Sequence, residues 1–205
     1  MSNAKKFSSA AGSWIEKHSG EKSENEMKII RYGLEVLYLN IIKIVVLIMI
    51  SYFAGIIEYT LVAALTFSLA RIFGFGMHAK STWGCYVATG SIYIGIPLMM
   101  KSIHLGIIFR IFLIILMFIG LWLYAPADTE QRPILGEKKR FRFKIKAIIL
   151  MGTLAGFSFA VPQIYGDIMI LSLIGEVIMI LPITYKLFSR GYRNYETYEC
   201  TIKCS

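Results

Sequence analysis

Long apolar runs alternate with short polar connectors along most of the 205-residue chain. A helix needs about 20 mainly apolar residues to cross the roughly 30 Å hydrocarbon layer of a bilayer. The runs that approach this length lie at about residues 34–53, 56–73, 85–100, 103–125, 145–165 and 168–185. The second, third and sixth runs are at or slightly below it. We expect about six membrane-spanning helices, and we count four of them as firm, since a run slightly below this length can still span.

The overall composition agrees with this pattern. The chain is 56% hydrophobic and 17% charged, with a mean hydropathy of +0.60, and a soluble domain of this size has no interior large enough for so many apolar side chains. Every backbone polar group in lipid must be paired internally, and the runs are too long for barrel strands. The sequence thus predicts an all-α, polytopic integral membrane protein.

The basic residues predict how the chain is oriented. Of the 22 lysines and arginines, 19 lie before the first span, in alternate connectors and in the C-terminal tail. Because basic residues accumulate on the cytoplasmic side, we expect both termini and the connector at residues 71–84 to face the cytoplasm of a cell-membrane protein. The net charge of +9 then favours anionic membrane lipids as partners, rather than nucleic acid.

Three segments follow from these patterns. Residues 1–30 form a cytoplasmic N-terminal segment, residues 31–188 the membrane-embedded domain and residues 189–205 a cytoplasmic tail. Apolar side chains recur at helical spacing over residues 5–18, which predicts an amphipathic helix lying in the membrane interface. The alternative is a flexible, charged lead-in.

The stretch "RIFGFGMHAKSTWGC", residues 71–85, places His78 seven residues before Cys85. On an uninterrupted helix this spacing would separate the two residues by about 10.5 Å along the axis. Proton exchange requires a separation of about 3 Å. If the two residues cooperate, the helix must break between them. Gly74 and Gly76 can turn the backbone, and Ser81 or Thr82 can cap the next helix.

Cys85 would then lie in the first turn of that helix. The positive end of the helix dipole and an adjacent histidine would lower the pKa of its thiol and make it a nucleophile. The alternatives are a cysteine that fills space between helices and a histidine that anchors the interface. A metal site would need three or four ligands, and only His104, on the opposite side, is spare nearby. We expect neither a metal nor a cofactor.

The same stretch resembles the signature of the accessory gene regulator B (AgrB) family of membrane cysteine endopeptidases. The matching residues are Arg71, Gly76, His78, Ala79 and Cys85. The later "APADTEQRPI" resembles the Ala-Pro…Asp…Pro connector of the family, with Asp128 and Pro133 in place. Phe75 departs from the pattern, because many members have glycine there; we expect Gly74 to supply the flexibility instead.

The resemblance implies that the protein processes an AgrD-like precursor into a cyclic autoinducing peptide for quorum sensing. His78 would take the proton of Cys85, and the thiolate would attack the amide before the C-terminal tail of the precursor. A thiol or hydroxyl of the precursor would then displace the enzyme and close a thiolactone or lactone. The resemblance also implies a homodimer.

Several supporting residues have two interpretations each. Arg71 is either a ligand for the precursor's tail or an interfacial anchor. Asp128 either orients His78, or binds the substrate, or is a plain turn residue. Ser91 is either an oxyanion donor or a residue of helix packing.

Two charged residues, Arg110 and Glu176, lie inside apolar runs, where charges are usually paired. We hypothesise that they pair with each other. If they instead line a path across the bilayer, the protein would be a non-catalytic transporter or peptide exporter, which is the alternative function. Cys200 and Cys204 are expected to be idle or acylated thiols, since structural disulfides are rare in the cytoplasm.

Overall fold

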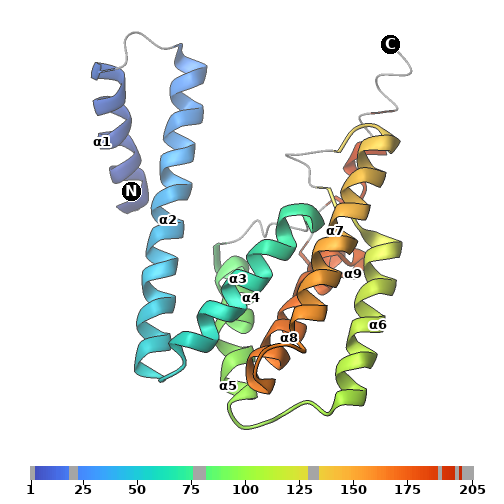
Figure 1. Cartoon of the computed structure of the whole chain (residues 1–205). Helices are drawn as coiled ribbons and strands as arrows, with labels where there is room; N and C mark the ends of the chain where they lie inside the picture. Colours follow the sequence, from blue (N-terminus) through green and yellow to red (C-terminus); the bar gives the residue numbers. More distant parts are fainter. Residues whose placement is uncertain are drawn as a thin grey trace. The chain divides into compact units, whose positions relative to one another are not determined.

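The computed structural model describes residues 3–18, 23–75, 82–128, 134–188, 191–196 and 199. Its chain divides into two compact units, Met1–Ala54 and Gly55–Ser205. The helices of the first unit are α1 (Asn3–His18) and α2 (Glu24–Phe53). Those of the second are α3 (Ile57–Gly74), α4 (Thr82–Gly90), η1 (Ser91–Gly95), α5 (Ile96–Met100), α6 (Ile107–Tyr124), α7 (Glu137–Phe157), α8 (Gln163–Ile180) and α9 (Pro182–Leu187) (Figure 1).

The first unit is a pair of helices that pack on each other. A stripe of small residues on α1, Ala4, Ser8 and Gly12, is buried, and the Phe7 and Tyr38 rings stack at 5.0 Å. Ser23 caps α2 in a capping box with Glu26. The helix expected over residues 5–18 is confirmed, while its placement in the membrane interface stays a prediction. The expected segment boundary after residue 30 falls inside α2.

Four described helices are long and apolar enough to cross a membrane: α2, α3, α6 and α8. Their exposed apolar side chains match a lipid environment, in which apolar groups need no burial; Ile108 on α6, for example, is 81% exposed. An all-α membrane protein is therefore confirmed. The third expected span is a continuous helical run through α4, the π-helical η1 and α5.

The last two expected spans had the wrong boundaries. We expected helices at 145–165 and 168–185, but α7 ends at Phe157 and α8 already begins at Gln163. Pro162 explains the difference, because a proline lacks the N–H of a helix interior and is favoured at a helix start. The sixth run ends at Ile180, and residues 182–187 form the separate short helix α9.

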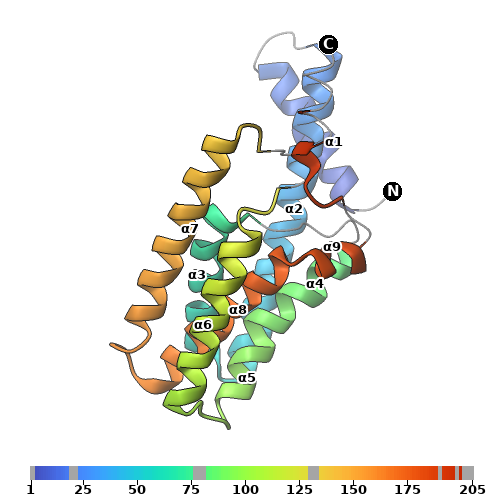
Figure 2. The same ribbon diagram turned by 90° about the vertical axis from the view of Figure 1, so that its right-hand side faces the viewer.

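Helix α8 is the centre of the second unit. It packs against α3, α5, α6 and α7 (Figures 1 and 2), and 61% of its residues are buried, compared with 28% for α6. Gly120 of α6 allows close approach, since a Cβ there would overlap Val177 of α8. One core cluster lies near Leu121 and Leu173 and a second near Leu113 and Ile168.

Asp167 neutralises the buried arginine of α6. The Arg110 Nε lies 3.4 Å from Asp167 Oδ1, with the carboxylate fully buried, and Arg110 Nη2 donates to the Ser158 carbonyl at 2.7 Å. The Leu105 amide donates to Asp167 Oδ2 at 3.1 Å. The hypothesised Arg110–Glu176 pair is therefore wrong: Glu176 lies nine residues farther along α8, or about 13.5 Å along its axis.

We expect Asp167→Asn to destabilise the protein by about 3 kcal/mol or more, because it leaves Arg110 buried without a counter-charge. Thermal unfolding in detergent measures the effect. Glu58→Gln is the control, since Glu58 contacts Tyr165 only in an exposed hydrogen bond. Equal unfolding temperatures for Asp167→Asn and Glu58→Gln would show that the buried pair does not stabilise the fold.

Candidate functional site

Residues 70–90 do not form one continuous helix, as the sequence predicted. Helix α3 ends at Gly74 and α4 begins at Thr82, so Cys85 is the fourth residue of a new helix rather than part of a continuous one. His78 and Gly76 lie outside the described residues, as do the side chain of Cys85 and both tail cysteines. Ser91 is exposed at the start of η1, about 9 Å along the helix axis from Cys85.

The turn at the end of α3 falls on Phe75, contrary to the expectation that Gly74 supplies it. Phe75 has a φ of 64°, a conformation that favours glycine. Its amide donates to the Arg71 carbonyl at 3.2 Å, and the Ala127 amide donates to the Gly74 carbonyl at 3.2 Å. Phe75 and Ala127 thus form a short parallel bridge that holds the connector after α6 against the end of α3.

Gly74 is required for a different reason, which is close packing against α8. A Cβ at Gly74 would lie 2.9 Å from Glu176 Oε1. Glu176 is fully buried, and neither carboxylate oxygen has a hydrogen-bond partner among the described residues. Arg71 is the opposite charge that acts on it, and the Arg71 guanidinium lies 5.7 Å from the centre of the Phe67 ring. An acidic and a basic residue therefore both lie near the end of α3.

Asp128 fastens the C-terminal segment to this end of the protein. The Asn194 and Tyr195 amides donate to its carboxylate at 3.1 and 2.7 Å, and the Tyr185 hydroxyl donates to its carbonyl at 2.9 Å. The structure thus shows a role for Asp128 that the sequence did not predict, a hold on residues 194–195, while the roles expected for it stay predictions. These contacts span 57 to 67 residues of sequence, which is why the turn pattern around Asp128 did not reveal them.

Burial raises the pKa of the Asp128 carboxyl above its ordinary value of 3.8, and the two amide hydrogen bonds oppose this rise. Because the pKa of the Asp128 carboxyl is higher in the folded state, the carboxylate binds a proton more tightly there than in the unfolded chain. The corresponding contribution to stability is complete below pH 3.8 and is lost as the pH rises through the folded pKa.

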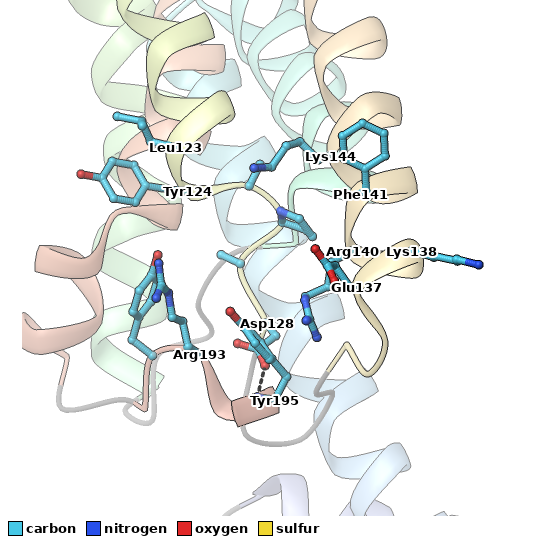
Figure 3. Close-up of a pocket in the computed structure, with 14 residues that line it drawn as sticks. Leu123, Tyr124, Asp128, Glu137, Lys138, Arg140, Phe141, Lys144, Arg193 and Tyr195 are labelled. Carbon is cyan, nitrogen blue, oxygen red and sulfur yellow. Dashed lines mark hydrogen bonds between the residues drawn. The ribbon is translucent and has the colours of Figure 1, made fainter. Parts of the chain in front are cut away.

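A cavity of about 440 Å³ lies beside Asp128 (Figure 3). Its charged lining residues are Asp128, Glu137, Lys138, Arg140, Lys144 and Arg193, and its aromatic ones are Tyr124, Phe141, Tyr192 and Tyr195. Cations outnumber acids in this lining. The sequence indicated a basic connector here, but it did not indicate that α6, α7 and the C-terminal segment enclose a cavity.

A metal centre finds no support in the part of the chain that the structure describes. No three histidine, cysteine, aspartate or glutamate side chains gather there in a way that could hold an ion. His104 Nδ1 lies 4.0 Å from Asp167 Oδ2. His104 is therefore next to the ion pair of Arg110 and Asp167.

The fold and this arrangement define a class: an all-α membrane protein with a glycine-containing helix break that is followed by a cysteine at a helix start. The chain belongs to the accessory gene regulator B family, which matches residues 8–180. This confirms the resemblance found in "RIFGFGMHAKSTWGC" and connects the protein with accessory gene regulation.

Relatives in several bacteria support this assignment. A putative AgrB-like protein of Listeria innocua is 33% identical over 190 residues, covering 90% of this chain and 91% of its own. A putative AgrB-like protein of Clostridium acetobutylicum is 32% identical over 181 residues, covering 88% and 87%. The accessory gene regulator protein B of Staphylococcus aureus is 33% identical over 156 residues, covering 76% and 82%. No solved structure matches the chain.

We expect Gly74→Ala to destabilise the protein by about 1–3 kcal/mol, because the added methyl would overpack the space beside a carboxylate that cannot turn to solvent. Shortening that carboxylate with Glu176→Asp should restore part of the loss. Thermal unfolding of the single and double variants measures both effects.

Gly90→Ala is the matched control for this pair, since a Cβ at Gly90 would meet open space. We expect it to be neutral or slightly stabilising, because alanine favours a helix more than glycine does. A Gly74→Ala variant as stable as Gly90→Ala would contradict the close packing described for Glu176.

We expect Asp128→Asn to release the C-terminal segment, because an amide cannot accept from both the Asn194 and Tyr195 amides as a carboxylate does. Hydrogen exchange at these two amides should quicken about tenfold or more, as the loss of bonds to a charged acceptor implies. Glu137→Gln, which changes another acid of the same cavity, should leave their exchange unchanged. Equal protection in both variants would contradict the role given to Asp128.

Proposed function

We propose that this protein is a membrane cysteine endopeptidase that removes the C-terminal tail of an AgrD-like precursor and promotes its cyclisation. The observation that carries the proposal is the break between α3 and α4, which puts Cys85 in the first turn of α4. Unpaired amides and the helix dipole make such a position favourable for a thiolate. The break also removes the fixed separation that one continuous helix would impose on His78 and Cys85.

In this mechanism His78 takes the proton from the Cys85 thiol. The thiolate forms a bond to the carbonyl carbon of the amide that precedes the tail, and the carbon–nitrogen bond breaks. His78 returns the proton to the departing amine, so the tail leaves as a neutral or protonated peptide. The product of this step is a thioester between Cys85 and the remaining precursor.

A thiol or hydroxyl within the precursor then attacks the thioester carbonyl. Its proton passes through His78, the new ring bond forms, and Cys85 is released as the leaving group. Water must be kept away from the thioester during this time, for which a site at the membrane surface is suitable. Since a thioester lies higher in energy than an amide, removal of the tail or of the ring product must draw the reaction forward.

The proposal places this site on the cytoplasmic side of the cell membrane. There the basic residues of α7 could contact anionic lipids and the precursor could approach from the interface. A homodimer is part of the proposal by family resemblance. The proposal has two supporting residues. Gly76 serves the turn of the chain, and Arg71 is a cation near the start of the loop that contains His78.

The transporter alternative rested on Arg110 and Glu176 lining a path across the bilayer, and the described residues do not support this arrangement. Arg110 forms a buried pair with Asp167 and a bond to the Ser158 carbonyl, which is the arrangement of a structural charge. Glu176 lies against Gly74, the last residue of α3. These two charges therefore do not mark out a path across the bilayer.

Co-expression with the candidate precursor tests the proposal. We expect Cys85→Ala and His78→Ala each to reduce cleavage by at least about 1000-fold, because the nucleophile or its base is lost. Mass spectrometry of the precursor and its fragments measures cleavage, and membrane fractionation shows that each variant still inserts. Normal cleavage by Cys85→Ala would refute the mechanism.

A further inference from the structure

One cation that lines the cavity beside Asp128, Arg140, already binds a carboxylate of the chain itself. Glu199 Oε1 accepts from Arg140 Nη1 at 2.6 Å and from the Gly136 amide at 2.8 Å. The Arg140 side chain is only 20% exposed. It also donates to the Ile134 carbonyl at 3.2 Å and stacks on the Tyr195 ring, with its guanidinium 3.9 Å from the ring centre.

These contacts make Arg140 a prepared carboxylate receptor. Stacking and a carbonyl contact restrict the guanidinium, so that less side-chain entropy is lost when it binds an anion. Charge-assisted hydrogen bonds are also the strong ones in proteins. Lys144 and Arg193 add positive charge to the same cavity, and Figure 3 shows Lys138 pointing away from it.

The segment whose glutamate binds Arg140 is acidic and aromatic. The segment at residues 191–199 reads "GYRNYETYE", with Tyr192 and Tyr195 among the cavity walls. Asp128 fixes its backbone at Asn194 and Tyr195, and Glu199 binds Arg140. Arg140 thus binds a glutamate of a segment whose backbone Asp128 holds in place.

The cavity also adjoins the break between α3 and α4. Ala127, one of its lining residues, is bridged to Phe75, directly before the loop that contains His78. A peptide bound in the cavity would therefore lie beside the connector that is bridged to the end of α3.

We propose that Arg140, at the edge of this cavity, is a recognition site for an acidic peptide segment, and that the chain's own C-terminal segment occupies Arg140 through Glu199. An acidic part of the peptide substrate and the C-terminal segment then compete for Arg140. The proposal rests on the proposed function for its substrate, but the binding that it describes requires no cleavage.

A direct binding measurement tests the competition. The probe is a fluorescently labelled synthetic peptide, GYRNYETYE, added to the purified full-length protein in detergent and followed by fluorescence anisotropy. We expect Glu199→Gln to bind the probe at least about fivefold more tightly than the unchanged protein, because a tethered competitor acts at high effective concentration. Arg140→Gln should lose this binding in either background.

Glu196→Gln is the matched control, because it makes the same charge change three residues earlier, at an exposed side chain that contacts Arg193. We expect it to bind the probe as the unchanged protein does. A probe whose last glutamate is glutamine should bind weakly to every variant. Arg140→Lys retains the charge without the planar fork and should give intermediate affinity, which separates loss of recognition from loss of folding.

Equal affinities for Glu199→Gln and the unchanged protein would overturn the proposal, as would tight binding by the Arg140→Gln/Glu199→Gln double variant. Full displacement of the probe by phosphatidylglycerol vesicles, but not by phosphatidylcholine vesicles, would overturn it in favour of an anionic lipid. Measuring the probe on Cys85→Ala separates this test from the peptidase mechanism. Where cleavage is active, Glu199→Gln should lower KM about fivefold and leave kcat unchanged, as an effect on binding alone requires.

Discussion

One main-chain hydrogen bond, from the Ala127 amide to the Gly74 carbonyl, joins the parts of the chain on which the candidate site depends. Gly74 ends α3 directly before the loop with His78, whereas Ala127 belongs to the connector that also contains Asp128. This bond therefore fixes the end of α3 relative to Asp128, which anchors the C-terminal segment, and relative to the Arg140 cavity. Such a bond gives the end of α3 a fixed position, which matters because loops alone position groups poorly.

The helix at the centre of the second unit has a carboxylate near each end, and the fold treats the two differently. Asp167 is matched by Arg110 and by a backbone amide, which is the usual way to bury a charge in an apolar surrounding. Glu176 has no hydrogen-bond partner among the described residues and is pressed against Gly74. The fold thus pairs one acidic group with a counter-charge and a backbone amide. It leaves the other without a hydrogen-bond partner among the described residues, at the end where the candidate site lies.

The sequence predicted features that depend on near neighbours. Apolar periodicity indicated the spans, and glycines with hydroxyl residues indicated the break before Cys85, because helix formation and capping are decided within a few residues. Boundaries at Phe157 and Gln163 were missed, since residues 158–162 are apolar enough to read as a continuing span. The turn at Phe75 was also missed, because the sequence favours glycine there and the bridge to Ala127 holds a phenylalanine in that conformation instead.

By itself the sequence determined the class of protein, the family and the position of the candidate nucleophile at a helix start. Only the tertiary structure decided which charges meet: Arg110 with Asp167, and Arg140 with Glu199. The physical reason is range. A membrane helix follows from the apolar character of its own residues, whereas these partners are 57 and 59 residues apart and meet only where tertiary packing brings them together.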